Sequence, residues 1–216
     1  MTLESGATMI GDVVASKKVR DRADLQRRME YMLHETTQRF ECVQPLQLTV
    51  GDEFQGVFLS VADATLASML LRLDLLPDLD ARFGIGVGEY EVFDRNRTPF
   101  AQDGPAWWAA RQAIDEVTRR SRKPRLRRVR TRVAAGDGLS EVTAGAVNAY
   151  LLCRDETIGR MGDRARRLLH RAALGQTQDQ IAKAEGITQS AVSQSLGRSG
   201  AGAVLAAQAE LEASFR

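Results

Sequence analysis

Residues 46–59 read LQLTVGDEFQGVFL, and this stretch decides the fold that the sequence predicts. Apolar residues on both sides of Gly51 and Asp52 predict two short strands, at residues 46–50 and 53–59. A Gly-Asp pair between such strands is typical of a tight turn. The stretch therefore predicts a β-hairpin with two acidic residues, Asp52 and Glu53, at its turn.

Strands and helices are also predicted on both sides of the hairpin. Residues 7–14 have the pattern of a buried strand, and Asp24 can cap a helix that ends near Phe40. The later segments predict a helix, a strand, a loop, a helix and an edge strand, at residues 64–76, 82–92, 95–105, 106–120 and 126–133. The order β-α-β-β-α-β-α-β is the ferredoxin-like βαββαβ order with an extra helix and strand. The sequence therefore predicts an α+β fold whose first domain is residues 1–135.

The remainder of the chain has helical patterns and no strand signals. Residues 136–138 read as a linker, and residues 139–175 predict two helices. Small residues at 195–203 predict a flexible joint before a final helix at 203–215. We therefore expect a second, all-helical domain at residues 139–216.

Residues 177–200, TQDQIAKAEGITQSAVSQSLGRSG, have the pattern of a helix-turn-helix. Thr177 and Gln180 have capping-box spacing, Gly186 lies where a left-handed turn favours glycine, and Thr188 can cap the second helix. Short polar side chains on that helix can meet base edges and phosphates. The alternative is a helical hairpin that only packs or dimerises. We expect DNA contacts from Thr188, Gln189, Ser190, Ser193 and Gln194, with Gln189 and Gln194 reading bases, and phosphate contacts from Arg164, Arg166, Arg167, Arg171, Lys183 and Arg198.

Charge is distributed unevenly along the chain. Residues 1–118 have 12 Lys/Arg and 19 Asp/Glu, whereas residues 119–216 have 18 and 9. An acidic part joined to a basic part favours two modules, the basic one facing a polyanion. Residues 119–133, RRSRKPRLRRVRTRV, contain nine of these cations. They either protect an edge strand from pairing or form a phosphate-contacting surface.

Composition sets wider limits on the class of protein. The chain is 44% hydrophobic and 27% charged, and no stretch approaches the roughly 20 apolar residues of a membrane span. The N-terminal residues do not read as a secretory signal. Cys42 and Cys153 are expected to be buried free thiols, and the cysteines and histidines have no zinc-ligand spacing. We expect a cytoplasmic protein with no membrane partner.

Acidic residues at strand ends predict a candidate metal site. Asp12 follows an apolar strand in MIGDVV, and Asp52 and Glu53 lie at the hairpin turn. Paired carboxylates of this kind can hold Mg²⁺, which organises the phosphates of a nucleotide. The alternatives are local capping by Asp12, turn chemistry at Asp52 and simple exposure of Glu53.

The first 135 residues resemble the palm domain of class III nucleotidyl cyclases and GGDEF diguanylate cyclases. Asp12 matches their first metal-binding acid, VGDEF (50–54) differs from GGDEF at one residue, and RFGIGVG (82–88) resembles their next core strand. Arg111 matches a phosphate-steadying arginine, whereas Trp107 replaces the family's asparagine. The resemblance implies Mg²⁺ at Asp12, Asp52 and Glu53, catalysis by Asp12, Asp52 and Arg111, and a homodimer. Ser16, Lys17 and Gly51 are candidate nucleotide contacts; Ser16 and Lys17 could instead only cap the loop after the first strand.

The C-terminal part and the chain as a whole carry two further resemblances. Residues 164–195 resemble the helix-turn-helix of sigma-factor region four. IGDVVASK (10–17) and GDEFQ (51–55), followed by a helical half, resemble the SatD family of small bacterial proteins over nearly the full length. We expect a DNA-binding regulator whose palm-like domain binds Mg²⁺ and a nucleotide. The alternatives are a Mg²⁺-dependent nucleotidyl cyclase or nucleotidyltransferase with a regulatory tail, and a non-catalytic dimerisation scaffold.

Overall fold

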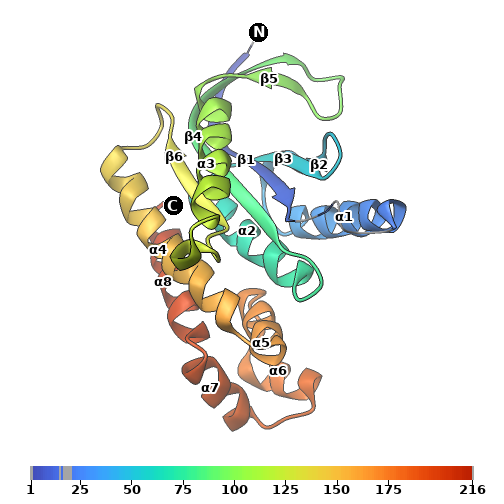
Figure 1. The fold of residues 1–216 in the computed structure, drawn as a ribbon, viewed down its shortest axis with the longest axis vertical. Helices are drawn as coiled ribbons and strands as arrows, with labels where there is room; N and C mark the ends of the chain where they lie inside the picture. Colours follow the sequence, from blue (N-terminus) through green and yellow to red (C-terminus); the bar gives the residue numbers. More distant parts are fainter. Residues whose placement is uncertain (1, 15, 17–20, 216) are drawn as a thin grey trace.

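A six-stranded sheet and eight α-helices make up residues 2–14, 16 and 21–215, which the computed structural model describes (Figure 1). Along the chain these are β1 (Thr2–Val13), α1 (Arg22–Thr37), β2 (Cys42–Leu48), β3 (Glu53–Phe58), α2 (Val61–Leu75), β4 (Ala81–Asp94), β5 (Ala101–Asp103), α3 (Pro105–Ser121), the 3₁₀ turn η2 (Pro124–Leu126), β6 (Thr131–Ala135), α4 (Glu141–Arg160), α5 (Asp163–Ala173), α6 (Gln178–Glu185), α7 (Gln189–Arg198) and α8 (Ala201–Ser214). The fold is therefore mixed α/β. None of the described helices is both long enough and apolar enough to cross a membrane.

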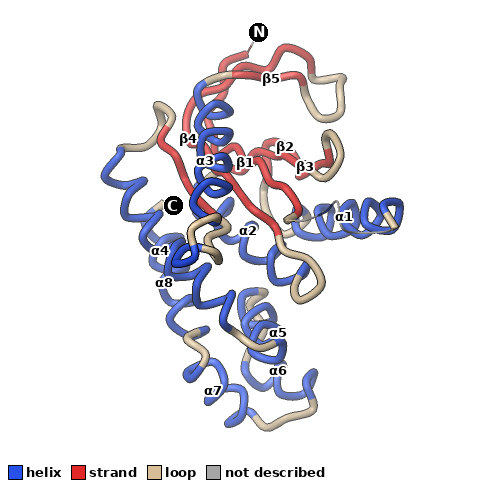
Figure 2. The backbone as a smooth tube through the Cα atoms, in the orientation of Figure 1, coloured by secondary structure: helices blue, strands red, loops and turns tan. Residues whose placement is uncertain are grey.

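The sheet is built around the long strand β1. The strand order is β2-β3-β1-β4-β5, and β6 pairs with a different part of β4 from β5. Figure 2 shows the strands in red. β1 pairs antiparallel with β3 and with β4, and its pairing with β4 runs from Thr2 opposite Val92 to Val13 opposite Ala81. Only β6 is parallel to its neighbour. This order brings the end of β1 beside the start of both β3 and β4.

Two glycines in RFGIGVG allow α3 to lie directly on β4. A Cβ at Gly84 would be 2.3 Å from the carbonyl oxygen of Ala110, and one at Gly86 would be 1.9 Å from that of Ala106. The two glycines share one face of the strand, because side chains alternate between faces. The hydroxyl of Thr8 donates to the carbonyls of Gly86 (3.1 Å) and Ala106 (2.9 Å). Backbone contact therefore fixes α3 on this face.

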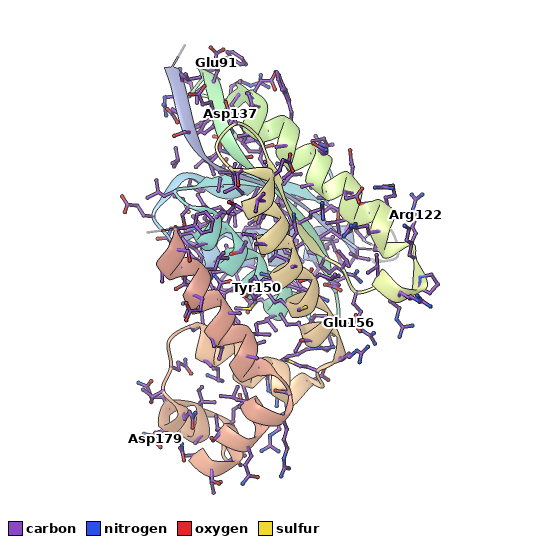
Figure 3. All side chains as sticks on the ribbon, turned by 90° about the vertical axis from the view of Figure 1, so that its left-hand side faces the viewer. Glu91, Arg122, Asp137, Tyr150, Glu156 and Asp179 are labelled. Atoms are coloured by element: carbon purple, nitrogen blue, oxygen red, sulfur yellow. The ribbon has the colours of Figure 1, made fainter. Side chains whose placement is uncertain are left out.

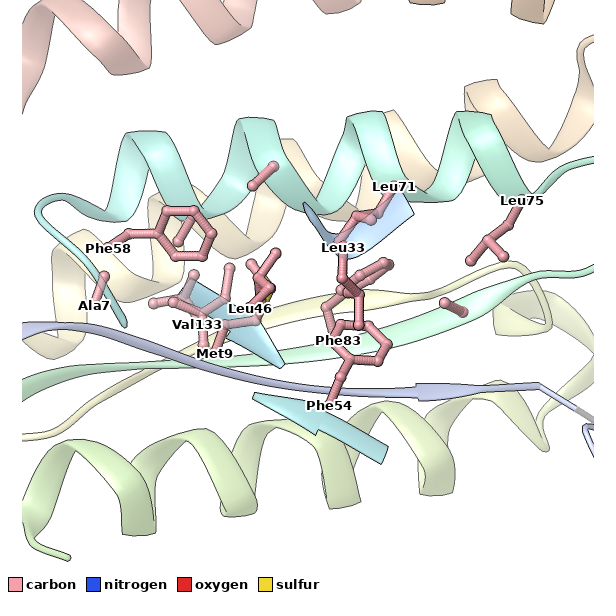
Figure 4. Packing of buried hydrophobic residues seen from close by; sticks show 14 of the residues in the cluster. Ala7, Met9, Leu33, Leu46, Phe54, Phe58, Leu71, Leu75, Phe83 and Val133 are labelled. Atoms are coloured by element: carbon pink, nitrogen blue, oxygen red, sulfur yellow. The ribbon is translucent and has the colours of Figure 1, made fainter. Parts of the chain in front are cut away.

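The opposite face of the sheet carries the main hydrophobic core, beneath α1 and α2. Phe54 and Phe83 meet edge to face at 5.9 Å between ring centres. Leu33 of α1 and Leu71 of α2 close the layer above them, as Figure 4 shows. Val147 and Leu151 of α4 belong to the same core, so the first C-terminal helix packs with the sheet half.

A buried network of charges joins α4 to α2 and β6. The carboxylate of Asp155 is fully buried and accepts hydrogen bonds from the backbone N–H groups of Arg130 and Thr131, both at 2.7 Å. Its other oxygen accepts from the buried guanidinium groups of Arg72 (3.3 Å) and Arg154 (3.2 Å). Arg72 also pairs with Asp80 at 2.9 Å. The network holds three elements that are distant in sequence against one another.

The last four helices form a second hydrophobic core that includes part of α2. Met69 and Leu73 of α2 pack with buried residues of α5, α6, α7 and α8, among them Leu168, Ile181 and Val192. In Figure 1, α5, α6 and α7 lie at the end of the molecule away from β5, and α8 runs back beside α4. Because α2 also covers the sheet, it contributes to both cores.

Several element boundaries differ from those the sequence predicts. Asp21, and not Asp24, is the N-cap of α1, and its side chain accepts from the N–H of Asp24. The predicted loop at 95–105 contains β5, which pairs with the end of β4. The predicted edge strand at 126–133 is the turn η2 followed by β6, because Pro124 begins a 3₁₀ turn. Cys153, expected to be buried, is exposed, and Cys42 is half-buried.

Two segments predicted as a linker and a joint are ordered by hydrogen bonds. The N–H groups of Gly136 and Gly138 both donate to the carbonyl of Val87, and the Asp137 carboxylate accepts from the N–H of Glu89. At 195–203, α7 continues to Arg198, and Gly200 then takes a left-handed conformation from which α8 starts. Gly200 therefore makes a tight turn between α7 and α8, where the sequence predicts a flexible joint.

The buried network predicts a large stability loss when its acid is neutralised. We expect Asp155→Asn to lower the free energy of unfolding by about 3–5 kcal/mol, because the buried Arg154 loses its acid partner and the buried Arg72 loses one of its two. Urea denaturation measures this difference. The control is Glu156→Gln on the same helix, whose surface ion pairs predict a loss of about 1 kcal/mol or less. Equal losses in the two variants would contradict the role assigned to Asp155.

Candidate functional site

The three acids predicted to hold a metal lie at one end of the sheet. Asp12 is near the end of β1, opposite Glu53 on β3 and opposite Arg82 on β4. Asp52 lies in the turn immediately before Glu53. The structure therefore brings all three acids into one region, and it adds a cation that the sequence prediction gave no role.

Two arginines engage both oxygens of two of these carboxylates. Arg82 donates through Nε and Nη2 to Asp12, at 2.8 and 3.0 Å, and through Nη1 to the hydroxyl of Thr118. Arg111 on α3 donates to both oxygens of Glu53 at 2.8 Å. The hydrogen bonds to Glu53 raise the pKa of Arg111 above its ordinary value. Asp12 and Glu53 are thus each neutralised by a bidentate ion pair.

The electrostatics of Asp12 show that the acids influence one another. Burial raises the pKa of Asp12 above its ordinary value of 3.8, and the hydrogen bond and charge of Arg82 only partly offset it. The charges of Asp52 and Glu53 raise it further. The three carboxylates therefore repel one another, and the two arginines balance part of that repulsion.

This arrangement does not fit a bound Mg²⁺. Magnesium requires carboxylate oxygens that face the ion in a near-octahedral arrangement. Here both oxygens of Asp12 and both oxygens of Glu53 face guanidinium groups. Within the described ranges, no three His, Cys, Asp or Glu side chains are grouped so that they could hold a metal ion.

The predicted nucleotide contacts have different surroundings. Asp52 and Gly51 line a pocket of about 210 Å³ between the hairpin turn and α1, and Gly51 has a positive φ of 73°. Ser16 is buried, and its carbonyl accepts from Arg22 at 3.0 Å. Lys17 lies outside the described residues. Gly51 and Asp52 are thus grouped around one pocket, whereas the Ser16 backbone contributes to the local structure.

Trp107, at the position of the cyclase asparagine, is a core residue. It is 7% exposed and packs with Ile10 and Val57 between α3 and the sheet. Its indole N–H has no partner among the described residues. The neighbouring Trp108 is exposed and donates to the carboxylate of Asp103 at 2.7 Å. Arg111 lies one turn further along α3 and bonds to Glu53.

The helix pair α6–α7 has each local feature that the sequence predicts. The Thr177 hydroxyl accepts from the N–H of Gln180, and the Gln180 side chain accepts from the N–H of Thr177, which completes a capping box. Gly186 has a left-handed φ of 65°, and Thr188 caps α7 by accepting from Ala191. Ile181 and Val192 are buried between the helices.

One side of α7 is polar and open to solvent. The exposed polar and charged residues of α7 and its N-cap are Thr188, Gln189, Ser190, Ser193, Gln194 and Arg198. Lys183 on α6 is also exposed. Next to α7 is a concave surface that encloses a volume of about 830 Å³. Residues of α4, α5 and α7 line it, among them Arg160, Arg164 and Arg198. Arg160 was not predicted, because nothing in the sequence indicates that the end of α4 lies beside α7.

Three of the four arginines on α5 that are predicted to contact phosphates make intramolecular ion pairs. Arg167 (3.2 Å) and Arg171 (2.9 Å) both bind Glu185 at the end of α6. Arg166 donates to the carbonyl of Ile158 and pairs with Asp163. These three arginines therefore help to hold α5 in place, whereas Arg164 is exposed and makes no ion pair among the described residues.

A known protein family matches the chain over most of its length. The model of the SatD family (SatD) matches residues 7–210, which include the acids of the sheet and the α6–α7 pair. The chain belongs to the SatD family. No curated protein matches the chain. The two motifs that suggest SatD in the sequence, at 10–17 and 51–55, contain Asp12 and Glu53, which are adjacent across β1 and β3 of this SatD chain.

The arginine–acid pairs predict how the SatD chain responds to Mg²⁺. We expect Mg²⁺ alone to leave the thermal midpoint of the wild type unchanged, because Asp12 and Glu53 are already neutralised. Arg82→Ala/Arg111→Ala releases both carboxylates, so its midpoint should rise when Mg²⁺ is added at constant ionic strength. Differential scanning fluorimetry measures both.

Arg39→Ala/Arg97→Ala, which removes two exposed cations, is the matched control and should not respond. A rise in the wild type that disappears in Asp12→Asn/Asp52→Asn would contradict the expectation. It would favour a Mg²⁺-dependent role for the site.

Glu185 predicts a pH-dependent contribution to the packing of α5 on α6. Burial raises its pKa, but the hydrogen bonds and the charges of Arg171 and Arg167 together outweigh burial, so the pKa lies below its ordinary value of 4.5. Stabilisation by the ionised carboxylate is therefore present above pH 4.5 and is lost as the pH falls through the folded-state pKa.

We expect Glu185→Gln to lower the free energy of unfolding by about 1–2 kcal/mol at pH 7, since Arg167 is exposed and its pair is screened by water. The difference from the wild type should shrink below pH 4.5 in denaturation experiments. A difference that stays constant from pH 7 to pH 3 would show that the charge of Glu185 is not what stabilises the packing.

Proposed function

We propose that this protein is a DNA-binding regulatory protein whose α6–α7 pair acts as a helix-turn-helix. α7 is the recognition helix in this proposal, and Gln189 and Gln194 read base edges in the major groove. The caps at Thr177 and Thr188 and the left-handed Gly186 support it, since they fix a short, sharp connection between two packed helices.

The observation that carries the proposal is the pairing of an exposed polar helix face with a cationic concave surface. Gln194 lines the same surface as Arg160, Arg164 and Arg198. Uncharged polar groups suit base edges, and flanking cations suit phosphates. A helical hairpin that only packs would be expected to place apolar groups on this face, yet its outward residues are polar.

We further propose that residues 1–135 form a palm-like domain of the ferredoxin-like type and that residues 139–216 form the DNA-binding domain. The antiparallel strand order β2-β3-β1-β4 and the acids at the ends of β1 and β3 support the palm-like comparison. A nucleotide at the pocket beside Asp52 would act through linkage, by favouring one placement of the recognition helix. α2, which packs with both halves, is the element that would couple them.

We also propose that the protein is a cytoplasmic protein of bacteria and that it acts as a homodimer. Two copies would present two recognition helices to half-sites one helical turn apart, as dimeric helix-turn-helix proteins do. Catalysis by Asp12, Asp52 and Arg111 has less support, because Arg111 is bound to Glu53 and Asp12 to Arg82.

The proposal predicts sequence-dependent DNA binding through α7. Sites are first selected from a random duplex library with the full chain, and affinity is then compared between the selected duplex and a scrambled one. We expect Gln189→Ala/Gln194→Ala to reduce this preference roughly tenfold or more, since a well-placed amide–base contact is worth about 1–3 kcal/mol of discrimination.

Gln38→Ala/Gln112→Ala is the control, because it removes two exposed glutamines from the sheet half. It should bind as the wild type does. If the wild type binds no duplex, or if the α7 variant keeps its full preference, the proposed function is wrong.

A further inference from the structure

Four cations of the basic run 119–133 have no role in the fold described above. Arg122, Lys123, Arg125 and Arg127, which we call the cationic tip, are all exposed and pair with no acid among the described residues. They lie between the end of α3 and the start of β6. The tip is therefore a surface of four positive charges that the intramolecular contacts leave free.

Four of the other five cations of the run make intramolecular ion pairs, and the fifth, Arg132, is half-buried on β6. Arg119 and Arg120 both pair with Glu116, Arg128 pairs with Glu156, and Arg130 pairs with Asp80. Protection of a strand edge does not account for the tip, because η2 and its flanking residues precede β6 and pair with no strand. The position of the tip on a turn instead leaves all four side chains accessible to a partner.

Arg128 anchors the tip to the end of α4. Its Nε donates to the carbonyl of Gly159 at 3.1 Å, and its Nη1 donates to Glu156 at 3.2 Å. A Cβ at position 159 would be 2.5 Å from the Cδ of Arg128, so glycine makes room for this side chain within α4. The position of the tip relative to α4 is therefore fixed by specific contacts.

The same contacts connect the tip to the concave surface beside α7. Glu156 also pairs with Arg160, which lines that surface together with Arg164 and Arg198. Arg160, Arg128 and Arg127 all help to lower the pKa of Glu156, so their charges lie close to one carboxylate. Arg122 and Glu156 are on the same side of the molecule in Figure 3. Positive charge thus continues from the recognition helix, past the end of α4, to η2.

We propose that the cationic tip binds backbone phosphates of the same DNA duplex whose groove α7 enters. The proposal rests on the DNA-binding function proposed above and extends its interface to a segment outside the helix-turn-helix. A row of exposed cations suits a polyanion, because each exposed pair contributes little alone whereas several release condensed counterions together. The tip adds affinity and orientation, and it carries no base readout.

The test is the salt dependence of DNA binding by the full chain. In Arg122→Ser/Lys123→Ser/Arg125→Ser/Arg127→Ser, the slope of log K against log salt concentration should become shallower by about 0.9 for each phosphate that the variant no longer binds. Its preference for the selected duplex over the scrambled one should equal that of the wild type. Progressive shortening of the duplex should remove the difference between variant and wild type once the flanking phosphates are gone.

A control removes four exposed cations from the sheet half: Arg27→Ser/Arg28→Ser/Arg39→Ser/Arg97→Ser. It has the same net charge as the tip variant, and its slope should match that of the wild type. Circular dichroism and thermal unfolding establish that both variants fold.

The outcomes separate this inference from the proposed function. If the tip variant keeps the wild-type slope while Gln189→Ala/Gln194→Ala loses sequence preference, the tip does not bind DNA and the proposed function stands. The tip is equally excluded from the DNA interface if the slopes of the control and the tip variant become shallower by the same amount. If the tip variant keeps the wild-type slope on DNA but no longer binds vesicles of anionic lipid, the cationic tip is a lipid-binding surface and not part of the DNA interface. If the wild type binds no DNA at all, the proposed function fails first.

Discussion

The carboxylate of Asp155 is the point on which the arrangement of the two halves depends. It lies within α4, and it accepts backbone hydrogen bonds from the start of β6 and side-chain hydrogen bonds from Arg72 of α2 and Arg154 of α4. A buried charge of this kind is tolerated only with its full set of partners, and it specifies geometry more than it adds stability. Apolar packing alone would let α4 slide on the sheet, whereas these directional contacts select one position.

A fixed α4 determines where the remaining helices can lie. α5 to α8 continue from its end and bury their apolar faces against α2, the helix that also covers the sheet. Gln208 of α8 is buried and donates to the carbonyl of Ala62 on α2, and it accepts from the hydroxyl of Tyr150 on α4. The chain therefore returns to the sheet half after it has passed through the α6–α7 pair, so that pair is held from both ends.

Local features were predictable from sequence, whereas contacts between distant segments were not. The hairpin at Gly51, the capping box at Thr177 and the left-handed Gly186 each depend on neighbouring residues, and all were predicted correctly. β5 is only three residues long and depends on the end of β4, so its own composition did not indicate a strand. The partners of Arg82, Arg167 and Arg171 depend on strand register and helix packing, and a basic residue on a predicted helix looks the same whether it faces solvent or an internal acid. For the same reason the acids could be grouped by strand order, but their neutralisation could not be foreseen.

The glycines of β4 also determine what can move near the acids. Because Gly84 and Gly86 let the backbones of β4 and α3 touch, a shift of α3 along the strand would drive carbonyl groups into the sheet. Arg82 belongs to β4 and Arg111 to α3, so both guanidinium groups are mounted on a single rigid body. The acids that they hold belong to the neighbouring strand pair β1–β3. Release of Asp12 or Glu53 therefore requires a long arginine side chain to rotate while the backbone keeps nearly constant geometry.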